Sequence, residues 1–307
     1  ALAPARHERN RPVESGQEPR MLIAQITDIH LGFVRFNPDE FNRQRLDATL
    51  AALTAMSPRP DLLLVTGDIA NDGDDAQSYH RYRDAIAGMP IPSFPLMGNH
   101  DSRGPFLELF PETESENGFI QYAIEDWPLR ILVLDTLEVG RHGGGFCETR
   151  AAWLRQRLDE APERPTLIAL HHPPIATGID WLTEDPDAEW VARLHRTVNG
   201  RSNIVAMISG HVHRPIVTGW GGTTLIVCSS TAPQLALDLS PIDAEVPDDR
   251  AMIVAEPPGY ALHLWDGRQL TTHFDTAQDH EVLARYTPNL QPLVRMLSDE
   301  KKTSEAA

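Results

Sequence analysis

Short apolar runs alternate with amphipathic segments over the first two thirds of the chain. Runs of four to six residues predict buried strands, and they cover residues 21–26, 62–65, 92–96, 165–170 and 204–208. Apolar residues at helical spacing predict helices between them: one that opens at 37–39 and ends at Pro58, and others over 74–86, 149–158 and 189–198. This alternation of strand and helix predicts an α/β fold in which helices cover a sheet.

The rest of the chain is rich in predicted strands. They cover residues 119–124, 129–134, 216–220, 223–227, 252–255, 259–265 and 270–274, and a Pro- and Asp-rich loop near the site rim spans 238–258. We expect a polar N-terminal tail over 1–20, one large domain over 21–275 and a C-terminal extension over 276–307. That extension has one helical patch at 290–297, which suits either a solvated tail or an oligomer arm.

Composition narrows the possible partners. The 307-residue chain is 41% hydrophobic and has a formal net charge of −17, with Lys301 and Lys302 as its only lysines. No basic track suits long nucleic acid, and no apolar run near 18 residues suits a membrane span. The two cysteines, Cys147 and Cys228, predict packing residues in a reducing cytoplasm rather than a disulfide scaffold. The N-terminus lacks the apolar region of a signal peptide.

Side chains that bind metals or move protons follow five of the predicted strands. At or just past the strand ends lie Asp28, His30, Asp68, Asn99, His100, Asp101, His171, His211 and His213. Because open α/β sheets place their sites at the carboxyl ends of strands, we expect these groups to converge. Alternation along an extended segment would put Asp28 beside His30 and His211 beside His213. Gly98 would let the chain turn sharply before Asn99.

Taken one at a time, these residues have simpler explanations. An Asp after Gly usually caps a turn or helix, and a single buried His is usually a packing residue. Those explanations would have to hold separately at five strand ends. We give them only to His7, His80, His142, His195, His263, His273 and His280; His172 we expect beside the site rather than on a metal. The Gly-rich loop 140–145 lacks the context of a phosphate-binding loop, so we expect a flexible turn.

The candidate ligands offer nitrogen and oxygen but no thiolate, which suits Zn, Mn or Fe(II). Seven of them (Asp28, His30, Asp68, Asn99, His171, His211 and His213) exceed the needs of one tetrahedral ion. That number suits two ions that share a carboxylate, an arrangement used for phosphate-ester hydrolysis. Two cations would also offset the repulsion between an acidic chain and an anionic substrate.

Five sequence blocks resemble the calcineurin-like metallophosphoesterases: Asp28-x-His30, Gly67-Asp68, Gly98-Asn99-His100-Asp101, His171, and Gly210-His211-x-His213. The resemblance covers residues 21–274. It implies the metallophosphoesterase fold, an α/β sandwich of two packed mixed sheets flanked by helices. The segments 170–174 and 256–260 resemble the bacterial cyclic-nucleotide and glycerophosphodiester phosphodiesterase branch.

The resemblance also implies a role for each residue. One ion would take Asp28, His30, Asp68 and His213; the other would share Asp68 and take Asn99, His171 and His211. His100 would act on the substrate, with Asp101 orienting its ring. The implied activity is hydrolysis of small phosphodiesters, such as cyclic nucleotides or glycerol- or aryl-type diesters.

Alternatives to a diesterase remain open at this stage. A phosphomonoesterase or nucleotide pyrophosphatase could use the same scaffold, and a non-catalytic binding module is a third possibility. A monoester dianion usually needs extra cationic donors. The loops after the motifs offer only Arg35, Arg103 and Arg214, which favours diesters, and the acidic run 71–75 would add to this if it lined the pocket. We also expect a homodimer or larger oligomer.

Overall fold

The structure, a computed structural model, describes residues 20–305. The expected N-terminal tail, apart from Arg20, and His7 lie outside the described residues. The described chain divides into two compact units, and the boundary along the sequence falls between Ala277 and Gln278. The first unit holds all of the candidate site residues.

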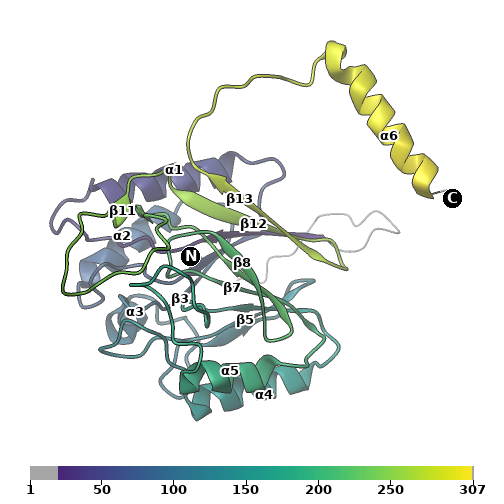
Figure 1. Cartoon of the computed structure of the whole chain (residues 1–307). Helices are drawn as coiled ribbons and strands as arrows, with labels where there is room; N and C mark the ends of the chain where they lie inside the picture. Colours follow the sequence, from purple (N-terminus) through teal and green to yellow (C-terminus); the bar gives the residue numbers. More distant parts are fainter. Residues whose placement is uncertain (1–19, 306–307) are drawn as a thin grey trace. The chain divides into compact units, whose positions relative to one another are not determined.

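A five-stranded sheet forms one layer of the first unit (Figure 1). Its strand order is β13-β12-β1-β2-β3. The strands are β1 (Met21–Ile26), β2 (Leu62–Thr66), β3 (Ser93–Leu96), β12 (Gly259–Trp265) and β13 (Leu270–Thr276). The first three run parallel, and β12 and β13 pair antiparallel.

A six-stranded sheet forms a second layer, in the order β4-β5-β6-β7-β9-β8. The strands are β4 (Tyr122–Ile124), β5 (Arg130–Val133), β6 (Thr166–Ala169), β7 (Ile204–Ser209), β8 (Ile216–Trp220) and β9 (Thr223–Val227). The four central strands, β5, β6, β7 and β9, are parallel to one another. The edge strands β4 and β8 are antiparallel to their neighbours. A small hairpin pairs β10 (Gln234–Leu235) with β11 (Ile253–Val254).

Helices form the outer layers. The helices of the first unit are α1 (Phe41–Ala55), α2 (Ala76–Ile86), α3 (Arg103–Leu109), α4 (Glu148–Glu160) and α5 (Glu189–Val198). Figure 1 shows α4 and α5 beneath the six-stranded sheet. The second unit contains a 3-10 turn, η1 (Pro288–Leu290), and α6 (Gln291–Glu305). None of the helices in residues 20–305 combines the length and apolarity that a bilayer crossing requires.

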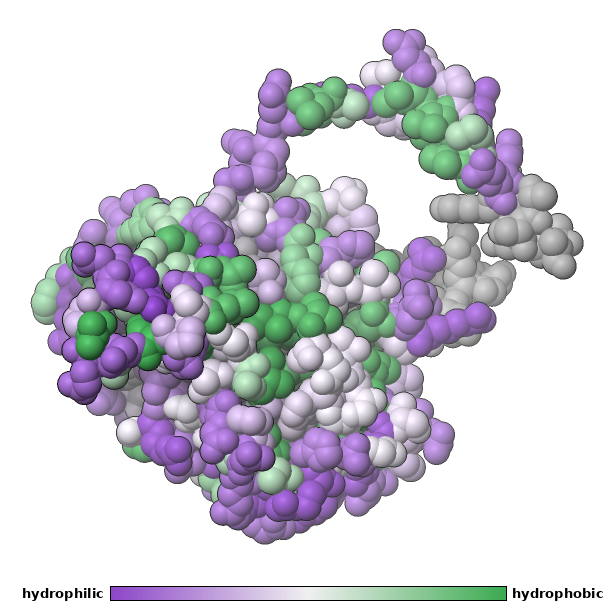
Figure 2. All heavy atoms as spheres, in the orientation of Figure 1, coloured by the Kyte–Doolittle hydropathy of each residue, from purple (hydrophilic) through white to green (hydrophobic). Residues whose placement is uncertain are grey.

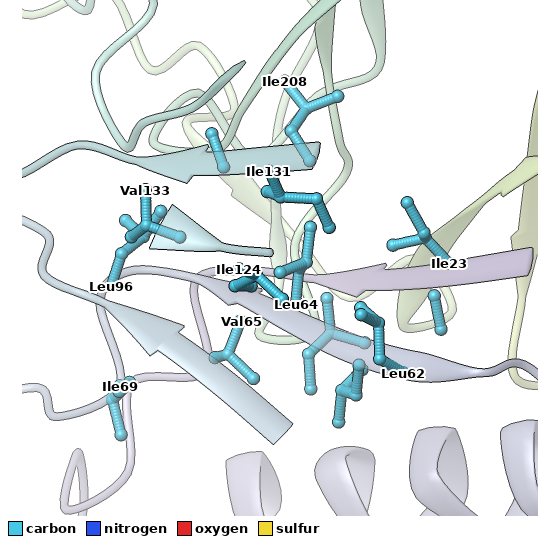
Figure 3. Packing of buried hydrophobic residues seen from close by; sticks show 14 of the residues in the cluster. Ile23, Leu62, Leu64, Val65, Ile69, Leu96, Ile124, Ile131, Val133 and Ile208 are labelled. Carbon is cyan, nitrogen blue, oxygen red and sulfur yellow. The ribbon is translucent and has the colours of Figure 1, made fainter. Parts of the chain in front are cut away.

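Alternation along β5 shows how the layers pack. Ile131 and Val133 join a core that includes residues of both sheets, whereas Leu132 belongs to a second core with α4 and α5. Figure 3 shows Ile131, Val133 and Ile208 clustered with Leu64 and Ile23 of the other sheet. Strands with both faces buried explain why the sequence reads as continuous apolar runs. The expected α/β sandwich of two mixed sheets flanked by helices is confirmed.

Some elements differ from the sequence prediction. The short helix α3 and strand β10 were not predicted, and the helix expected at 290–297 extends to Glu305. The predicted strand 119–124 is ordered as a strand only from Tyr122. Short elements such as these carry too few residues for a periodic pattern to emerge.

Candidate dinuclear metal site

All seven candidate ligands come together at the carboxyl edge of the two sheets. Asp28 and Asp68 follow β1 and β2, whereas His171 follows β6 of the other sheet. Even so, His171 Nε2 lies 3.3 Å from Asp68 Oδ2 and 3.9 Å from Asp28 Oδ1. The site therefore joins the two layers.

The backbone at five of these positions is left-handed. The φ angles are +51° at Asp28, +51° at His30, +52° at Asp68, +73° at His211 and +53° at His213. Our expectation of an extended segment there was wrong, because β1 ends at Ile26 and β7 at Ser209. The side chains converge through alternate left-handed turns instead. Such conformations are costly for non-glycine residues and cluster at functional sites.

Four side chains form the first group: Asp28, His30, Asp68 and His213. His30 Nε2 lies 3.2 Å from His213 Nε2 and 3.7 Å from Asp68 Oδ2, and His213 Nε2 lies 3.4 Å from Asp28 Oδ1. Two atoms about 2.1 Å from a shared ion are roughly 3.0–3.4 Å apart. The 3.2 and 3.4 Å separations fall in this range, whereas His30 and Asp68 would have to approach slightly to share one cation with the others.

The second group shares Asp68 and adds Asn99, His171 and His211. His171 Nε2 lies 3.3 Å from Asn99 Oδ1, the same separation as from Asp68 Oδ2. The ring of His211 lies 5.1 Å from that of His171, between centroids. Asp68 thus stands between the two groups, as a bridging carboxylate requires.

Backbone carbonyls set the tautomers of two of the histidines. Thr66 O lies 2.7 Å from His171 Nδ1, and Pro233 O lies 2.8 Å from His213 Nδ1. A carbonyl only accepts, so each Nδ1 carries hydrogen and each Nε2 presents its lone pair to the site when the ring is neutral. This arrangement is typical of metal-binding histidines.

The site electrostatics favour cations. Burial would lower the pKa of His171, but the Asp68 and Asp28 carboxylates outweigh it and raise that pKa to about 9. At His30 burial prevails and lowers the pKa to about 3, so this ring is neutral and able to ligate at neutral pH. The two carboxylates thus draw positive charge into a buried pocket.

Each carboxylate is also held by backbone amides. His211 N donates to Asp28 Oδ2 over 2.9 Å, and His100 N donates to Asp68 Oδ1 over 2.8 Å. Thr27 Oγ1 donates to Asp28 Oδ2 over 2.7 Å. These bonds fix the orientation of both carboxylates, as is common for carboxylates that bind metals.

His100 lines a cavity that opens over the candidate site, but its ring is not oriented by Asp101 as expected. His100 Nδ1 instead lies 2.9 Å from Asn71 O. The Asp101 carboxylate accepts from Gly98 N over 2.9 Å, from Ala70 N over 3.0 Å and from Ile69 N over 3.1 Å. Asp101 therefore joins the loop after β3 to the loop after β2. Adjacency in sequence does not reveal this, because neighbouring side chains on a turn point in different directions.

The sequence prediction missed His142. Its ring lies 5.0 Å from His211 and 6.2 Å from His100, between centroids, and it lines the cavity. His142 is exposed, in keeping with the surface role given to it, but nothing in the sequence indicated that it also lines the cavity. It sits in the Gly-rich loop, where Gly144 N donates to Glu184 Oε1 over 2.6 Å. No pattern in the chain marks this position, because the loop reaches the site only through tertiary folding.

His172 lies beside the site, as expected, with Nδ1 2.8 Å from Thr136 Oγ1. Its ring is 4.7 Å from that of His211, between centroids. His172 and His100 each lie close enough to other candidate ligands to share an ion with them. Geometry alone therefore leaves more possible donors than the seven.

Four of the candidate ligands line the cavity, which has a volume of about 380 Å³: His30, Asp68, His211 and His213. The acidic run does not line it as a whole: Asn71 does, whereas Asp72 pairs with Arg35 and Asp75 caps α2. The run 71–75 therefore adds no carboxylate to the wall of this cavity.

Comparisons with known proteins identify the family of this chain. Residues 21–215 match the calcineurin-like phosphoesterase family. A probable glycerophosphodiester phosphodiesterase, GpdQ of Arcobacter nitrofigilis, is 31% identical, and the alignment covers 82% of this chain and 92% of that protein. The 3',5'-cyclic adenosine monophosphate phosphodiesterase CpdA of Escherichia coli is 30% identical over 71% of this chain and 78% of its own.

Solved structures share the fold. A dimetal phosphatase from Danio rerio superposes with a TM-score of 0.57 at 15% identity, over 83% of this chain and 99% of that one. Its low identity makes this a likeness of fold alone. The sequence match and the fold confirm what the five motifs predict, and we conclude that the chain belongs to the calcineurin-like phosphoesterase family.

Proposed function

We propose that this protein is a phosphodiesterase that hydrolyses small phosphodiesters with two divalent ions, Mn, Fe or Zn. Asp28, His30, Asp68 and His213 would hold one ion; Asp68, Asn99, His171 and His211 would hold the other. The observation that carries the proposal is the Asp68 carboxylate between two groups of buried nitrogen and oxygen ligands. Relatives named as glycerophosphodiester and cyclic nucleotide phosphodiesterases support the substrate class.

Two divalent ions held by these residues would supply a water of lowered pKa and would offset the negative charge of the phosphoryl oxygens. The chain's own part falls chiefly to His100. Its Nδ1 is held at Asn71 O, so Nε2 is the atom free to carry a proton toward the leaving oxygen. Asp101 is a positioning residue that fixes the loops carrying Asp68 and Asn99.

Pairing of the nearby arginines supports diesters over monoesters. Arg103 donates to both oxygens of Asp135 over 2.6 and 2.7 Å, and Arg214 donates to both oxygens of Glu256 over 2.8 and 2.7 Å. Arg35 pairs with Asp72. None of the three is left to meet the second charge of a monoester dianion. A monoesterase or pyrophosphatase is therefore not favoured, and retention of all seven ligands argues against a non-catalytic module.

A substrate panel tests the proposal. The protein is loaded with Mn²⁺ and its rates on bis(p-nitrophenyl) phosphate, p-nitrophenyl phosphate and cyclic AMP are compared, with metal content measured on the same sample. We expect diester hydrolysis that a chelator abolishes and Mn²⁺ restores. Activity on the monoester alone, or no activity with both ions bound, would overturn the proposal.

Three further expectations belong to it. We propose residues 21–275 as the catalytic domain and a homo-oligomer as the working form, with the C-terminal extension as a candidate arm. We also propose a cytoplasmic location, supported by two free cysteines, Cys147 and the buried Cys228. Light scattering that shows a monomer at working concentration would remove the oligomer.

A further inference from the structure

One wall of the cavity over the candidate metal site is apolar. It is built from the loop after β1, the start of α1, a loop before α5 and the β10–β11 hairpin: Phe33, Val34, Phe41, Trp181, Leu182, Leu235 and Ile253. His30, His100, His211 and His213 line the same cavity. The apolar wall therefore begins where the proposed phosphate site ends.

Several of these side chains remain largely in water. Phe33 is 67% exposed, Phe41 52% and Ile253 64%. Figure 2 shows apolar residues (green) exposed among polar residues (purple) on the side of the molecule where β11 lies. Exposed apolar groups that line one concave site are typical of ligand-binding surfaces, because a ligand that covers them removes apolar area from water.

Buried charges hold the loop that carries Phe33. The Glu40 carboxylate accepts from Gly32 N, from Val34 N over 2.7 Å and from Arg81 Nη1 over 3.3 Å. Glu40 is itself buried. The backbone on both sides of Phe33 is therefore fixed, so this edge of the wall is a built feature.

Arginines fix the part of the wall that includes β10. Arg45 donates to Thr231 O over 2.7 Å and to Ala232 O over 3.1 Å, and Arg214 donates to Leu235 O. These arginines are thus committed to backbone carbonyls and do not line the cavity. Among the described residues that line it, none is Lys or Arg.

The wall also offers few hydrogen-bonding groups. Asn42 Nδ2 already donates to His30 O over 2.9 Å, and the Glu40 oxygens are taken by the loop. A wall of this kind discriminates by apolar area rather than by hydrogen bonds. A small polar group such as glycerol would leave most of the apolar wall exposed to solvent.

We propose that this wall binds an uncharged apolar ester group of the substrate, aromatic or branched alkyl, while the phosphate lies at the metal site. This inference rests on the proposed function and narrows its substrate class. It makes diesters with an apolar group better ligands than diesters whose groups are small and polar.

Two diesters of equal charge test it, each as a ligand that competes with the reporter substrate. Benzyl methyl phosphate and 2,3-dihydroxypropyl methyl phosphate are compared as competitive inhibitors of bis(p-nitrophenyl) phosphate hydrolysis by the Mn²⁺-loaded protein. We expect the benzyl diester to bind at least about tenfold more tightly, the order expected when a benzyl group leaves water. Calorimetry on the same pair should show a more negative heat-capacity change for the benzyl diester.

Variants locate the effect. The double variant Phe33→Ser, Ile253→Ser should bring the two inhibition constants to within about threefold of each other, because both side chains are exposed parts of the wall. Phe36→Ser is the matched control: Phe36 lies in the same loop, is 94% exposed and does not line the cavity. It should keep the parent's preference.

Each outcome decides the inference. Equal constants in the parent, or a preference that the double variant keeps, would overturn it while hydrolysis of the reporter leaves the proposed function standing. If the reporter is not hydrolysed, the proposed function fails. Calorimetry then still shows whether the wall binds the benzyl diester in preference to the dihydroxypropyl diester. Equal constants together with self-association that the double variant abolishes would assign the wall to a second copy of the chain.

Discussion

Gly98 lies so close to Asp68 that a β-carbon at position 98 would be well inside 3.0 Å of the carboxylate oxygen Oδ1. The sharp turn expected at Gly98 is not its main requirement, because its φ is not among the positive values. What the site needs is the missing side chain. The carboxylate of Asp68, the proposed bridge, occupies that space.

Gly98→Ala should therefore displace the Asp68 carboxylate and weaken the binding of both proposed ions. We expect at least a tenfold loss of metal affinity and a comparable loss of diesterase activity, since carboxylate position sets both. Titration of the protein with metal, monitored by calorimetry, measures the affinity. Gly104→Ala is the control, because a β-carbon there meets nothing within 4 Å. Equal metal affinity in the two variants would contradict this account.

Asp101→Asn tests the link between the loops after β2 and β3. An amide cannot accept from Gly98 N, Ile69 N and Ala70 N at once, and its NH₂ would face a donor. We expect unfolding free energy to fall by about 1–3 kcal/mol and metal affinity by about 10–100-fold. Denaturant unfolding with and without Mn²⁺ measures both, and the exposed Asp74→Asn serves as control. Unchanged metal affinity would leave Asp101 with no role in positioning.

His100→Ala separates proton transfer from metal binding. If His100 acts on the leaving group, the variant keeps both ions and loses roughly 10²–10⁴-fold in kcat. Metal content by elemental analysis is read beside kcat on bis(p-nitrophenyl) phosphate. Because His100 lies near His30 and Asp68, a parallel loss of metal would instead make it a ligand.

Stability should fall in acid partly because of His263. Its Nδ1 lies 2.8 Å from Thr272 Oγ1 and its Nε2 3.0 Å from Gln25 Oε1, and burial lowers its pKa from 6.5 to about 3. The unfolded chain then binds a proton that the folded one does not, so this contribution is intact above pH 6.5 and is lost as pH falls toward 3. Between pH 6 and 4.5 the loss is about 2 kcal/mol.

The variant His263→Gln removes this titration. The fall in its unfolding free energy between pH 6 and 4.5, measured by urea unfolding, should be about 2 kcal/mol smaller than the parent's. The exposed His273 on β13 provides the control, His273→Gln, which should follow the parent. Parallel curves for His263→Gln and the parent would show that the acid sensitivity arises elsewhere.

Local patterns were enough to locate the strands and the residues that follow them. An apolar run such as 62–66 forms a buried strand wherever it packs, and Gly67-Asp68 ends it by backbone preference. Since parallel strands bring their carboxyl ends to one edge, the convergence of Asp28 and Asp68 also follows from sequence order. His171 follows a strand of the other sheet, so its approach depends on how the two layers pack.

Tertiary structure decided what meets that edge from elsewhere. His142, the direction of the Asp101 carboxylate and the pairing of Arg103 with Asp135 all depend on contacts between segments far apart in the chain or on how a turn points its side chains. The wall from Phe33 to Ile253 is of the same kind, since it brings exposed side chains such as Phe33 and Ile253 beside the buried Leu182 and Leu235 from separate loops. Sequence determined the chemistry of the metal edge because that chemistry follows each strand locally. Only folding decided which substrate groups that edge can accommodate, because the cavity is assembled from loops that no local pattern links.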